Sequence, residues 1–378
     1  MKIPFAKPNL GLSELNEIKD TLKSGVLVHG RKSLSFEKMF FNLVSPNYGL
    51  STSSCTSALH MAAICINLKN NHEVMISAQT HVATAHAIEA VGARPVFIDS
   101  NEENGNINLD DLEKKITKKT KALVIVHFLG APQPMDEIMR FVRKHNLKLI
   151  EDCALSLGAK YKGKSVGTFG DYGCFSFHPV KMITTGEGGF LTIKNKKDYI
   201  RSKDLRSFGV RKNFYERSTP GLYDVPEFGL NFRMGELNSS LGIVQLGKFS
   251  AMLKKRESNY KRLKNHLLKN KNFRILNTES NKISQSSYYC MNIILNKSLV
   301  KHRNRIIKKI NDRGVGTSIY YPLPVPHFLY YKKKYNISSS SYKVSLLLSN
   351  STISLPVGPH ISKEEVDFIA KTINKILV

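Results

Sequence analysis

The sequence has no feature typical of a secreted or membrane-inserted protein. No apolar run approaches the roughly 20 residues that a membrane-spanning helix needs. The first residues, MKIPFAKPNLGLSE, contain neither the apolar core nor the cleavage site of a secretory signal. The five cysteines are odd in number and include no CxxC pair, which predicts reduced thiols rather than a disulfide framework. We therefore expect a cytoplasmic protein.

Metal-binding patterns are also missing, and acidic residues are scarce. No group of Cys and His has the spacing of a zinc site, so we predict no metal. The chain has 57 Lys and Arg against 30 Asp and Glu, a formal net charge of +27. The lysines are spread along the chain without a nucleic-acid recognition motif, which favours solvated helix faces. We expect neither nucleic acid nor a membrane as a partner, although a positive field attracts anionic substrates such as nucleotide diphosphates.

The chain does have a regular alternation of strand-like and helical segments between about residues 50 and 195. This alternation predicts an α/β fold whose central sheet is mostly parallel and is covered by helices on both faces. In such sheets, ligands bind at the carboxyl ends of the strands. The expected strands are 73–77 (EVMIS), 94–98 (RPVFI), 122–126 (ALVIV), 148–151, 172–177 and 189–193, and the expected helices are 84–91, 109–116 and 135–145.

The pattern changes after Gly235. Residues 236–270 have the apolar periodicity of one long helix or of two helices in series. A strand at 287–295 and helices at 300–312 and 363–376 follow, which indicates a smaller C-terminal α+β domain. We predict a large domain over 1–245 and a small domain over 246–378.

One segment places a lysine where its amine can react. In SFHPVKMITTGEGGFLTI (176–193), Lys181 lies between a buried strand and a Gly-rich turn, among apolar and small neighbours. Desolvation of such an amine lowers its pKa and frees its lone pair for attack on an aldehyde. A lone lysine in a loop is also often only a solvated charge, so this segment is suggestive by itself.

Two further segments contain residues that would suit the ring nitrogen and the phosphate of a phosphorylated pyridine. Asp152, in LKLIEDCALS, follows a very apolar strand, where a carboxylate is costly unless a positive group meets it. It is either a helix N-cap or structural ion pair, or the partner of a protonated pyridine nitrogen, which makes the ring an electron sink. In LSTSSCTSALHMAA, small hydroxyl residues lead into an apolar helix whose N-terminus suits a phosphate, although simple N-capping explains them as well.

Together these segments resemble the DegT/DnrJ/EryC1/StrS family of sugar aminotransferases, which are pyridoxal-phosphate enzymes of fold type I, like aspartate aminotransferase. SFHPVK with TTGEGG is the most specific part of the match. IEDCA, THVATAHAI with VGARPVFID, LNFRMGE and SLPVGPHIS extend it over nearly the whole chain. The resemblance implies that 1–245 is the pyridoxal-phosphate-binding domain and 246–378 the small C-terminal domain.

The resemblance also implies the roles of single residues. Lys181 is the catalytic residue and forms a Schiff base with pyridoxal phosphate, and Asp152 meets the pyridine nitrogen. Ser176, Thr56 and Ser57 bind the cofactor phosphate. These assignments apply to positions of this chain that match the family's motifs.

Other matching positions concern the second subunit and the cofactor ring. Asn231 matches an asparagine that reaches the phosphate from the neighbouring subunit, which implies a homodimer with shared active sites. His81 stands at the usually aromatic position that stacks on the ring, and it brings a possible charge. Leu155 replaces a Gln or His near the ring, so the protein must adjust the reactivity of the cofactor on that side in a different way or through another residue. Cys55 replaces a commoner glycine, and we interpret it as a small buried residue without a catalytic role.

The implied reaction moves the amino group of L-glutamate to the cofactor and then to a nucleotide-linked keto-deoxysugar, with Lys181 as base and then acid. Ping-pong kinetics should result. Such amino sugars serve surface polysaccharides, including lipopolysaccharide O-antigen, or other glycoconjugates. VGTSIYYPLPVPHF resembles the family's substrate-side loop, which makes Tyr320, Tyr321 and His327 candidates for contacting the sugar or its diphosphate, although such a proline-rich loop can be purely structural.

Two alternatives remain open. A few proteins of this fold dehydrate the sugar, and they carry His in place of the lysine, so Lys181 argues against that branch. A non-catalytic regulator that has kept the fold, or a nucleic-acid binder that uses the positive charge, would bind no cofactor and would bind DNA in a salt-sensitive way. The presence of both Lys181 and Asp152 argues against this second class.

Overall fold

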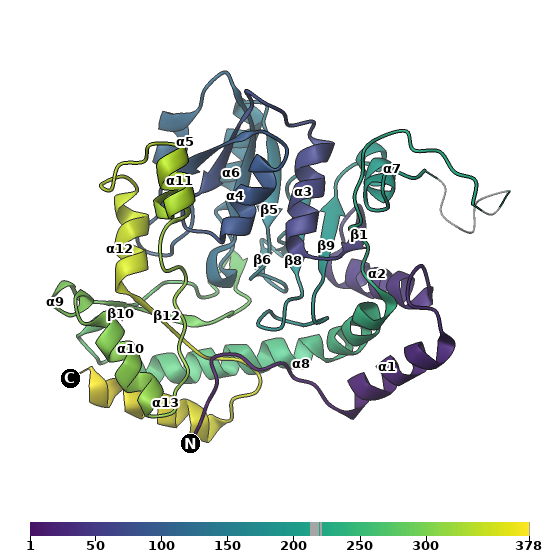
Figure 1. Ribbon diagram of the computed structural model, residues 1–378. Coiled ribbons are helices and arrows are strands. Elements are labelled where there is room, and N and C mark those ends of the chain that lie inside the picture. Colours follow the sequence, from purple (N-terminus) through teal and green to yellow (C-terminus); the bar gives the residue numbers. More distant parts are fainter. Residues whose placement is uncertain (212–218, 220, 378) are drawn as a thin grey trace.

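The computed structural model describes residues 1–211, 219 and 221–377. Its centre in these ranges is a seven-stranded sheet of strand order β1-β9-β8-β5-β4-β2-β3 (Figure 1). Strand β9 runs antiparallel to both neighbours, and the other neighbouring pairs are parallel, so the expected mostly parallel sheet is confirmed. The strands are β1 (Tyr48–Thr52), β2 (Glu73–Ser77), β3 (Arg94–Ile98), β4 (Thr120–Val126), β5 (Lys148–Asp152), β8 (Tyr172–Ser176) and β9 (Gly189–Ile193).

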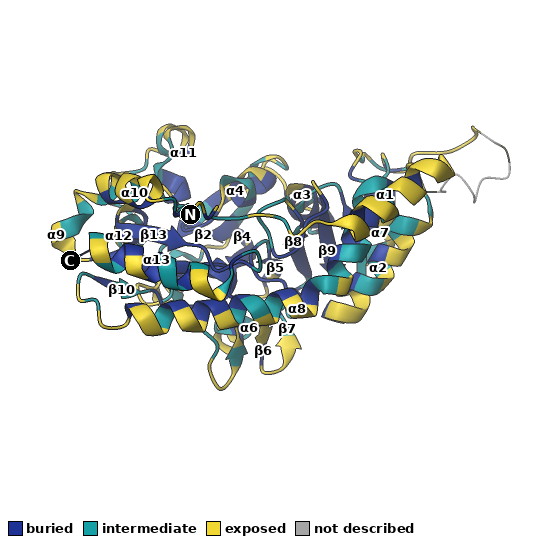
Figure 2. Ribbon diagram, turned by 90° about the horizontal axis from the view of Figure 1, so that it is seen from below, coloured by how far each residue is buried: buried dark blue, intermediate teal, exposed yellow. Residues whose placement is uncertain are grey.

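Helices cover both faces of this sheet, because successive side chains of each strand point to opposite sides. Val74 and Ile76 of β2 pack in one apolar cluster with α3 (Cys55–Cys65) and α4 (Val82–Glu89). Met75, between them, packs in another cluster with α5 (Leu109–Lys115) and α6 (Met135–Lys144). Both faces are therefore covered by apolar side chains, which explains why these strands are continuously apolar. Figure 2 shows the central strands as buried.

The long helix expected after Gly235 is a single element, α8 (Glu236–Leu267). One end packs against α1 (Leu12–Ser24) and α2 (Arg31–Val44), and the other end packs against α13 (Lys363–Ile376). Figure 1 shows α8 passing beneath the sheet from one side of the molecule to the other. The helix thus connects the central sheet to the C-terminal region.

The C-terminal region has its own three-stranded antiparallel sheet and its own apolar cluster. Its strands are β10 (Phe273–Ile275), β12 (Met291–Leu295) and β13 (Thr352–Leu355). The remaining elements are η1 (Phe128–Gly130), β6 (Lys160–Tyr161), β7 (Lys164–Ser165), α7 (Lys196–Leu205), β11 (Ser284–Gln285), α9 (Lys297–Val300), α10 (Arg303–Asp312), η3 (Val325–His327), α11 (Leu329–Lys334) and α12 (Lys343–Ser351). An α+β arrangement is what the sequence predicts for this region.

Several predicted ends are displaced by one to three residues, and two segments differ more from the prediction. The strand expected from Ser287 begins only at Met291, because the backbone N–H of Ser287 donates to Gly130 O (3.1 Å) and its hydroxyl donates to Leu155 O (2.8 Å). These bonds hold the segment around Ser287 beside Gly130 and Leu155, which follow strands β4 and β5 of the central sheet. The helix expected over 300–312 is divided into α9 and α10.

The domain division at residue 246 stays a prediction. Helix α8 passes through this position without a break. Segments also cross between the two regions: Ile3 pairs with Val315 and packs in the C-terminal cluster, whereas Val325 and Tyr331 pack in the cluster of α3 and α4. The two regions therefore exchange chain segments at their contact.

The described ranges contain no helix that is long and apolar enough to cross a membrane. All five cysteines are free in the structure, and four of them are buried. Their burial fits the interpretation of these residues as reduced thiols with packing roles.

Candidate active site

The candidate residues gather at one edge of the central sheet. Asp152 ends β5 and Ser176 ends β8, and these two strands are parallel neighbours. Helix α3 follows the end of β1, and His81 precedes α4 just after the end of β2. Gly189 begins β9, which runs in the opposite direction, so it lies at the same edge. The expectation that the site lies at the carboxyl ends of the strands thus fits the placement of these residues.

Asp152 is buried, with 4% of its surface exposed. Its Oδ2 accepts a hydrogen bond from the hydroxyl of Thr84 (2.8 Å), which is also paired with the hydroxyl of Thr80 (2.8 Å), and its Oδ1 accepts from Ala154 N (3.0 Å). No helix begins after it, and it forms no ion pair within the described residues. A carboxylate can accept more bonds than these two, so it can still receive a positive N–H donor.

Lys181 lies in the loop after β8, and its backbone N–H donates to His178 O (2.9 Å). Burial lowers the pKa of the Lys181 amine, while Cys55 and Asp152 act in the opposite direction. The amine nitrogen lies 5.8 Å from the ring centre of Tyr289. A desolvated amine with a lowered pKa is the state that a nucleophilic lysine requires.

Cys55, the first residue of α3, is affected by the charges of both Lys181 and Asp152. Burial raises the pKa of its thiol, the charge of Asp152 raises it further, and the charge of Lys181 lowers it. Cys55 is only partly buried, whereas the sequence predicts a buried side chain. The charges of both groups act on this thiol, so the three side chains lie in the same part of the sheet edge.

The start of α3 carries a ring of serine hydroxyls. Ser54 is the N-cap and accepts from Ser57 N (3.0 Å). The hydroxyl of Ser57 pairs with those of Ser53 (2.8 Å) and Ser54 (2.9 Å), whereas Thr56 is exposed. Capping therefore accounts for Ser54, and the other hydroxyls and the first N–H groups of the helix still suit a phosphate.

The turn before β9 approaches this helix start closely. A Cβ on Gly189 would lie 2.4 Å from the carbonyl carbon of Ser54, so only glycine fits there. Ser176 is partly buried beside Gly189 in the β8–β9 pair, and its hydroxyl accepts from His178 N at 3.4 Å. The hydroxyls expected to bind a phosphate are therefore at one end of the site.

This set of donors fits pyridoxal phosphate. Lys181 offers the amine for an aldehyde, Asp152 the acceptor for a pyridinium N–H, and the start of α3 with Ser176 the donors for a phosphate. Each group matches one functional end of the cofactor, and the placements come from separate strands that meet at one edge. Of the predicted residues, these have the most direct structural support.

His81 is the N-cap of α4, where its Nδ1 accepts from Ala83 N (3.3 Å). Burial lowers the pKa of the imidazole and Lys181 adds to this effect, so the ring is neutral at neutral pH despite the charge that the sequence allowed. Its ring centre lies 6.3 Å from that of Tyr321. A neutral ring at this place can cover one face of a cofactor.

Asn231 is exposed and forms an isolated bridge with Ser207. Its Oδ1 accepts from Arg233 N (3.4 Å), and the next carbonyl, of Phe232, accepts from Ser53 N (2.7 Å). The segment therefore lies against the serine loop of its own chain. Its predicted reach into a neighbouring subunit stays a prediction.

Tyrosines form the side of the site that faces the C-terminal region. The hydroxyls of Tyr289 and Tyr320 are 2.7 Å apart, and the ring centres of Tyr320 and Tyr321 are 5.2 Å apart. His327 is placed differently: its Nε2 contacts Ser341 O (2.9 Å) and its ring lies beside Tyr342. The structure thus groups Tyr320 with Tyr321 but not with His327.

Sequence reasoning missed two residues of the site, Thr84 and Tyr289. Thr84 could have been found, because it lies in THVATAHAI, a segment already matched to the family. Tyr289 carries no local signal, since its contact with Lys181 joins distant parts of the chain. Leu155, where the family often has a polar residue, is buried and its side chain packs in an apolar cluster.

A second buried cluster contains His127, Glu151 and Cys153, whose ligand atoms lie within 4.8 Å of one another. His127 Nδ1 accepts from Gln133 N (3.0 Å), so its Nε2 carries the proton and donates to Glu151 (3.1 Å). Glu151 also accepts three backbone N–H bonds. A metal ion would have to displace these bonds, which identifies the cluster as structural; the absence of a metal stays a prediction.

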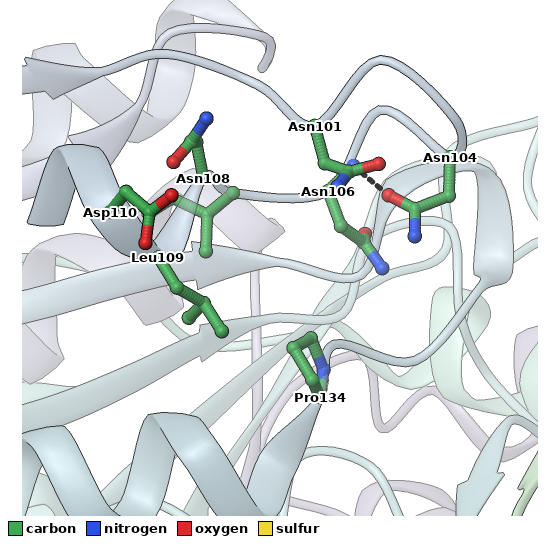
Figure 3. Close-up of a pocket in the computed structure, with 8 residues that line it drawn as sticks. Asn101, Asn104, Asn106, Asn108, Leu109, Asp110 and Pro134 are labelled. Atoms are coloured by element: carbon green, nitrogen blue, oxygen red, sulfur yellow. Dashed lines mark hydrogen bonds between the residues drawn. The ribbon is translucent and has the colours of Figure 1, made fainter.

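A polar pocket of about 280 Å³ lies near the ends of β3 and the start of α5 (Figure 3). Its amide groups are largely used within the loop, as where Asn104 Oδ1 accepts from Asn106 N (2.9 Å). None of the residues predicted for the active site lines it. The lining residues are Asn101, Asn104, Asn106, Ile107, Asn108, Leu109, Asp110 and Pro134.

Residues 8–374 match the model of the DegT/DnrJ/EryC1/StrS aminotransferase family. The chain belongs to this family. A GDP-perosamine synthase of Escherichia coli O157:H7 is 32% identical over 380 residues, which cover 99% of this chain and 98% of that protein. The family and the aminotransferase activity expected from the sequence are confirmed.

Solved structures agree with this assignment to the DegT/DnrJ/EryC1/StrS family. Helicobacter pylori PseC, an aminotransferase involved in the biosynthesis of pseudoaminic acid, is 27% identical, covers 100% of this chain and 99% of its own, and has a TM-score of 0.92. Spr1654 of Streptococcus pneumoniae in its PMP form is 26% identical, covers 99% of both chains, and has a TM-score of 0.94. Spr1654 has also been solved in its PLP form. The expected fold type I is confirmed, and the cofactor prediction agrees with these forms.

Proposed function

We propose that this DegT/DnrJ/EryC1/StrS family member uses pyridoxal phosphate to transfer the amino group of L-glutamate to a nucleotide-linked keto-sugar in the cytoplasm. The product would be an amino sugar for a surface polysaccharide or glycoconjugate. The observation that carries the proposal is that Asp152, the loop of Lys181 and the start of α3 lie together at the carboxyl edge of the sheet, where Asp152 and Ser176 end neighbouring parallel strands. The similarity to GDP-perosamine synthase and PseC supports a nucleotide-sugar substrate.

The residues at the edge would hold the cofactor at its three functional ends. When bound, pyridoxal phosphate supplies an aldehyde and a ring that withdraws electrons from a neighbouring carbon. The Asp152 carboxylate would keep the ring nitrogen protonated, and Thr84 fixes this carboxylate from behind. The hydroxyl of Ser57 and the first N–H groups of α3 would bind the phosphate. His81, as a neutral ring, would cover one face.

Lys181 would move the proton of the reaction. Burial lowers the pKa of its amine, so at neutral pH a larger fraction is neutral than for an exposed lysine. The neutral amine can take the proton from the α-carbon of the amino donor, and the resulting ammonium can return it one step later. Removal of the amine should therefore stop both half-reactions.

The tyrosines on the opposite side would face the sugar. Burial raises the pKa of Tyr320 to about 12, so its hydroxyl stays protonated and can donate a hydrogen bond. Tyr321 is buried next to it and supplies apolar ring surface. His327 stays a candidate for the diphosphate, since its ring lies apart from this pair. The formal net charge of +27 would attract the nucleotide diphosphate from solution.

The unpaired apolar surface at one end of the molecule supports a homodimer. Large apolar side chains are exposed on α1 and α2 and in the segment before Asn231, which lie at the same side in Figure 1. A second copy of the chain would cover this surface and bring its own Asn231 toward the site. The residues concerned are Leu12, Leu15, Leu22, Leu34, Leu222 and Phe228. Light scattering should give twice the chain mass, and Phe228→Glu should lower it.

A panel of nucleotide-linked keto-sugars tests the function. The purified protein is incubated with pyridoxal phosphate, L-glutamate and each sugar, and mass spectrometry follows the sugar. We expect an amino sugar and 2-oxoglutarate, and neither with Lys181→Ala. Loss of a hydroxyl without amine transfer would identify a dehydratase, and absence of both turnover and a cofactor absorbance band would identify a non-catalytic homologue.

A further inference from the structure

The ring of Tyr289 lies directly beside the amine of Lys181. The nitrogen is 5.8 Å from the ring centre, and Tyr289 is 97% buried, since 3% of its surface is exposed. Tyr289 comes from the segment between β11 and β12, which belongs to the C-terminal region, whereas Lys181 follows β8 of the central sheet. The two side chains therefore meet across the contact between the two regions.

Two bonds hold Tyr289 in place, one at its hydroxyl and one at its backbone carbonyl. The hydroxyl of Tyr289 pairs with that of Tyr320 at 2.7 Å, and the Nη1 of Arg256 donates to Tyr289 O at 2.9 Å. Arg256 is 7% exposed, forms no ion pair with any described carboxylate, and its Nε has no hydrogen-bond partner in the described chain. A buried guanidinium without an anion is costly, and the bond that it makes is to Tyr289.

The chemistry of the lysine explains why a ring is useful there. When Lys181 takes up a proton, it becomes an ammonium ion in surroundings that are poor in water. An aromatic face carries partial negative charge and attracts a cation that lies within about 6 Å of its centre. The attraction grows when the cation is desolvated, as it is here. The neutral amine gains little from the same ring.

We propose that Tyr289 is a positioning residue whose ring stabilises the ammonium form of Lys181 between uptake and release of the proton. Tyr320 holds Tyr289 by its hydroxyl, and Arg256 holds it by its backbone carbonyl. The inference rests on the proposed function, because that function makes Lys181 the proton carrier. Proton uptake places one positive charge on the lysine nitrogen, and proton release removes it.

Other charged or titratable groups also face the amine. They are Cys55 from α3, Asp152 from β5 and His81 at the start of α4. His178 lies in the lysine's own loop, where its backbone O accepts from Lys181 N. The thiol and the carboxylate favour the ammonium, and the imidazoles would oppose it if they became charged. A test must therefore change the ring without changing any of these four.

The apoprotein of the 378-residue chain provides that test, because the cofactor is not needed for the readout. Trace acetylation of Lys181, measured by mass spectrometry across a pH series, gives the pH at which the amine becomes neutral. Tyr289→Leu and Tyr289→Met should lower this midpoint by about one pH unit. Tyr289→Phe keeps the ring and loses only the hydroxyl that pairs with Tyr320, so its midpoint should fall by less than that of Tyr289→Leu.

Tyr288→Leu is the matched control. This tyrosine is adjacent and equally buried, but its hydroxyl bonds Ser280 and its ring packs in the C-terminal cluster. The loss of this ring should not move the midpoint of Lys181. A shift as large as that of Tyr289→Leu would show that general loosening is responsible and would overturn the inference.

Fluorinated phenylalanines at position 289 keep the experiment decisive if the aliphatic variants do not fold. Added fluorines weaken the negative face of the ring and hardly change its shape, so the midpoint should fall stepwise with their number. A flat series, or equal shifts for Tyr289→Phe and Tyr289→Leu, would overturn the proposal. Failure of the proposed function would appear separately, as absence of a cofactor band in the parent.

Discussion

Glu151 and Asp152 end the same strand, β5, but their carboxylates enter different surroundings because neighbouring side chains point to opposite faces. Glu151 has no exposed surface and accepts four hydrogen bonds, from the backbone N–H groups of Gly167, Phe169 and Gly170 and from the imidazole of His127. Asp152 accepts bonds from a threonine hydroxyl and one backbone N–H among the described residues.

The difference teaches how a buried carboxylate can be assigned a role. A carboxylate whose acceptor sites are filled by the protein fixes the loop that supplies the donors, here 167–170. A buried carboxylate with spare acceptor sites is stable only if another donor arrives, and for Asp152 we propose that this donor is a protonated ring nitrogen. Glu151 is therefore expected to matter for stability and Asp152 for chemistry.

The largest effect should come from removing the amine of Lys181, which we propose acts together with Asp152. In the proposed mechanism, Lys181→Ala deletes the proton carrier and the attachment point of the cofactor, so we expect a loss in kcat on the order of 10⁴-fold. The visible band of the protein-bound cofactor should disappear as well, as measured by absorbance. Lys160→Ala, an exposed lysine of β6, serves as control. Retention of the band in Lys181→Ala would show that another lysine holds the cofactor.

Asp152→Asn should cost on the order of 10²–10³-fold in kcat, because the amide cannot keep the ring nitrogen protonated. Stability in urea should change little, since the amide oxygen can still accept the bond from Thr84. The measurement pairs turnover with an unfolding curve. Loss of stability without loss of turnover would reverse the assignment of the two carboxylates.

Glu151→Gln should show the opposite pattern. An amide presents N–H groups to some of the four donors, so we expect a loss of about 3 kcal/mol in the free energy of unfolding, measured in urea. The matched control is Glu113→Gln, an exposed carboxylate paired with Lys144, which should leave stability unchanged. Equal stability of the two variants would show that the hydrogen bonds of Glu151 are not the ones described.

The smallest expected effect is a shift in pH dependence. Only the neutral amine captures the cofactor aldehyde, and burial lowers the pKa of Lys181 below its ordinary 10.5, so the capture rate of the apoprotein should rise with pH to a midpoint below 10.5. Asp152 raises this pKa, so Asp152→Asn should move the midpoint to lower pH. Stopped-flow absorbance measures the rate. A shift to higher pH would contradict the closeness of the two groups.

The sequence predicts the central strands well because their signal is local. The runs EVMIS and RPVFI coincide with β2 and β3, since strands that are buried on both faces are continuously apolar. The sequence also identifies Lys181 and Asp152 through segments that the family shares. Contacts between distant segments carry no such signal, as with Tyr289 beside Lys181. The diversion of 287–290 away from the C-terminal sheet likewise depends on partners, Gly130 and Leu155, that are remote in the chain.

The contact between Gly189 and Ser54 has a consequence for the tolerance of this chain to mutation. Since even a methyl group at position 189 would lie 2.4 Å from the carbonyl carbon of Ser54, every substitution there must push the start of α3 away from β9. Both elements belong to one closely packed apolar cluster, so the displacement would alter the start of α3, where we propose that the phosphate binds. In a saturation library, position 189 should therefore accept no replacement, although its side chain would touch no reacting atom.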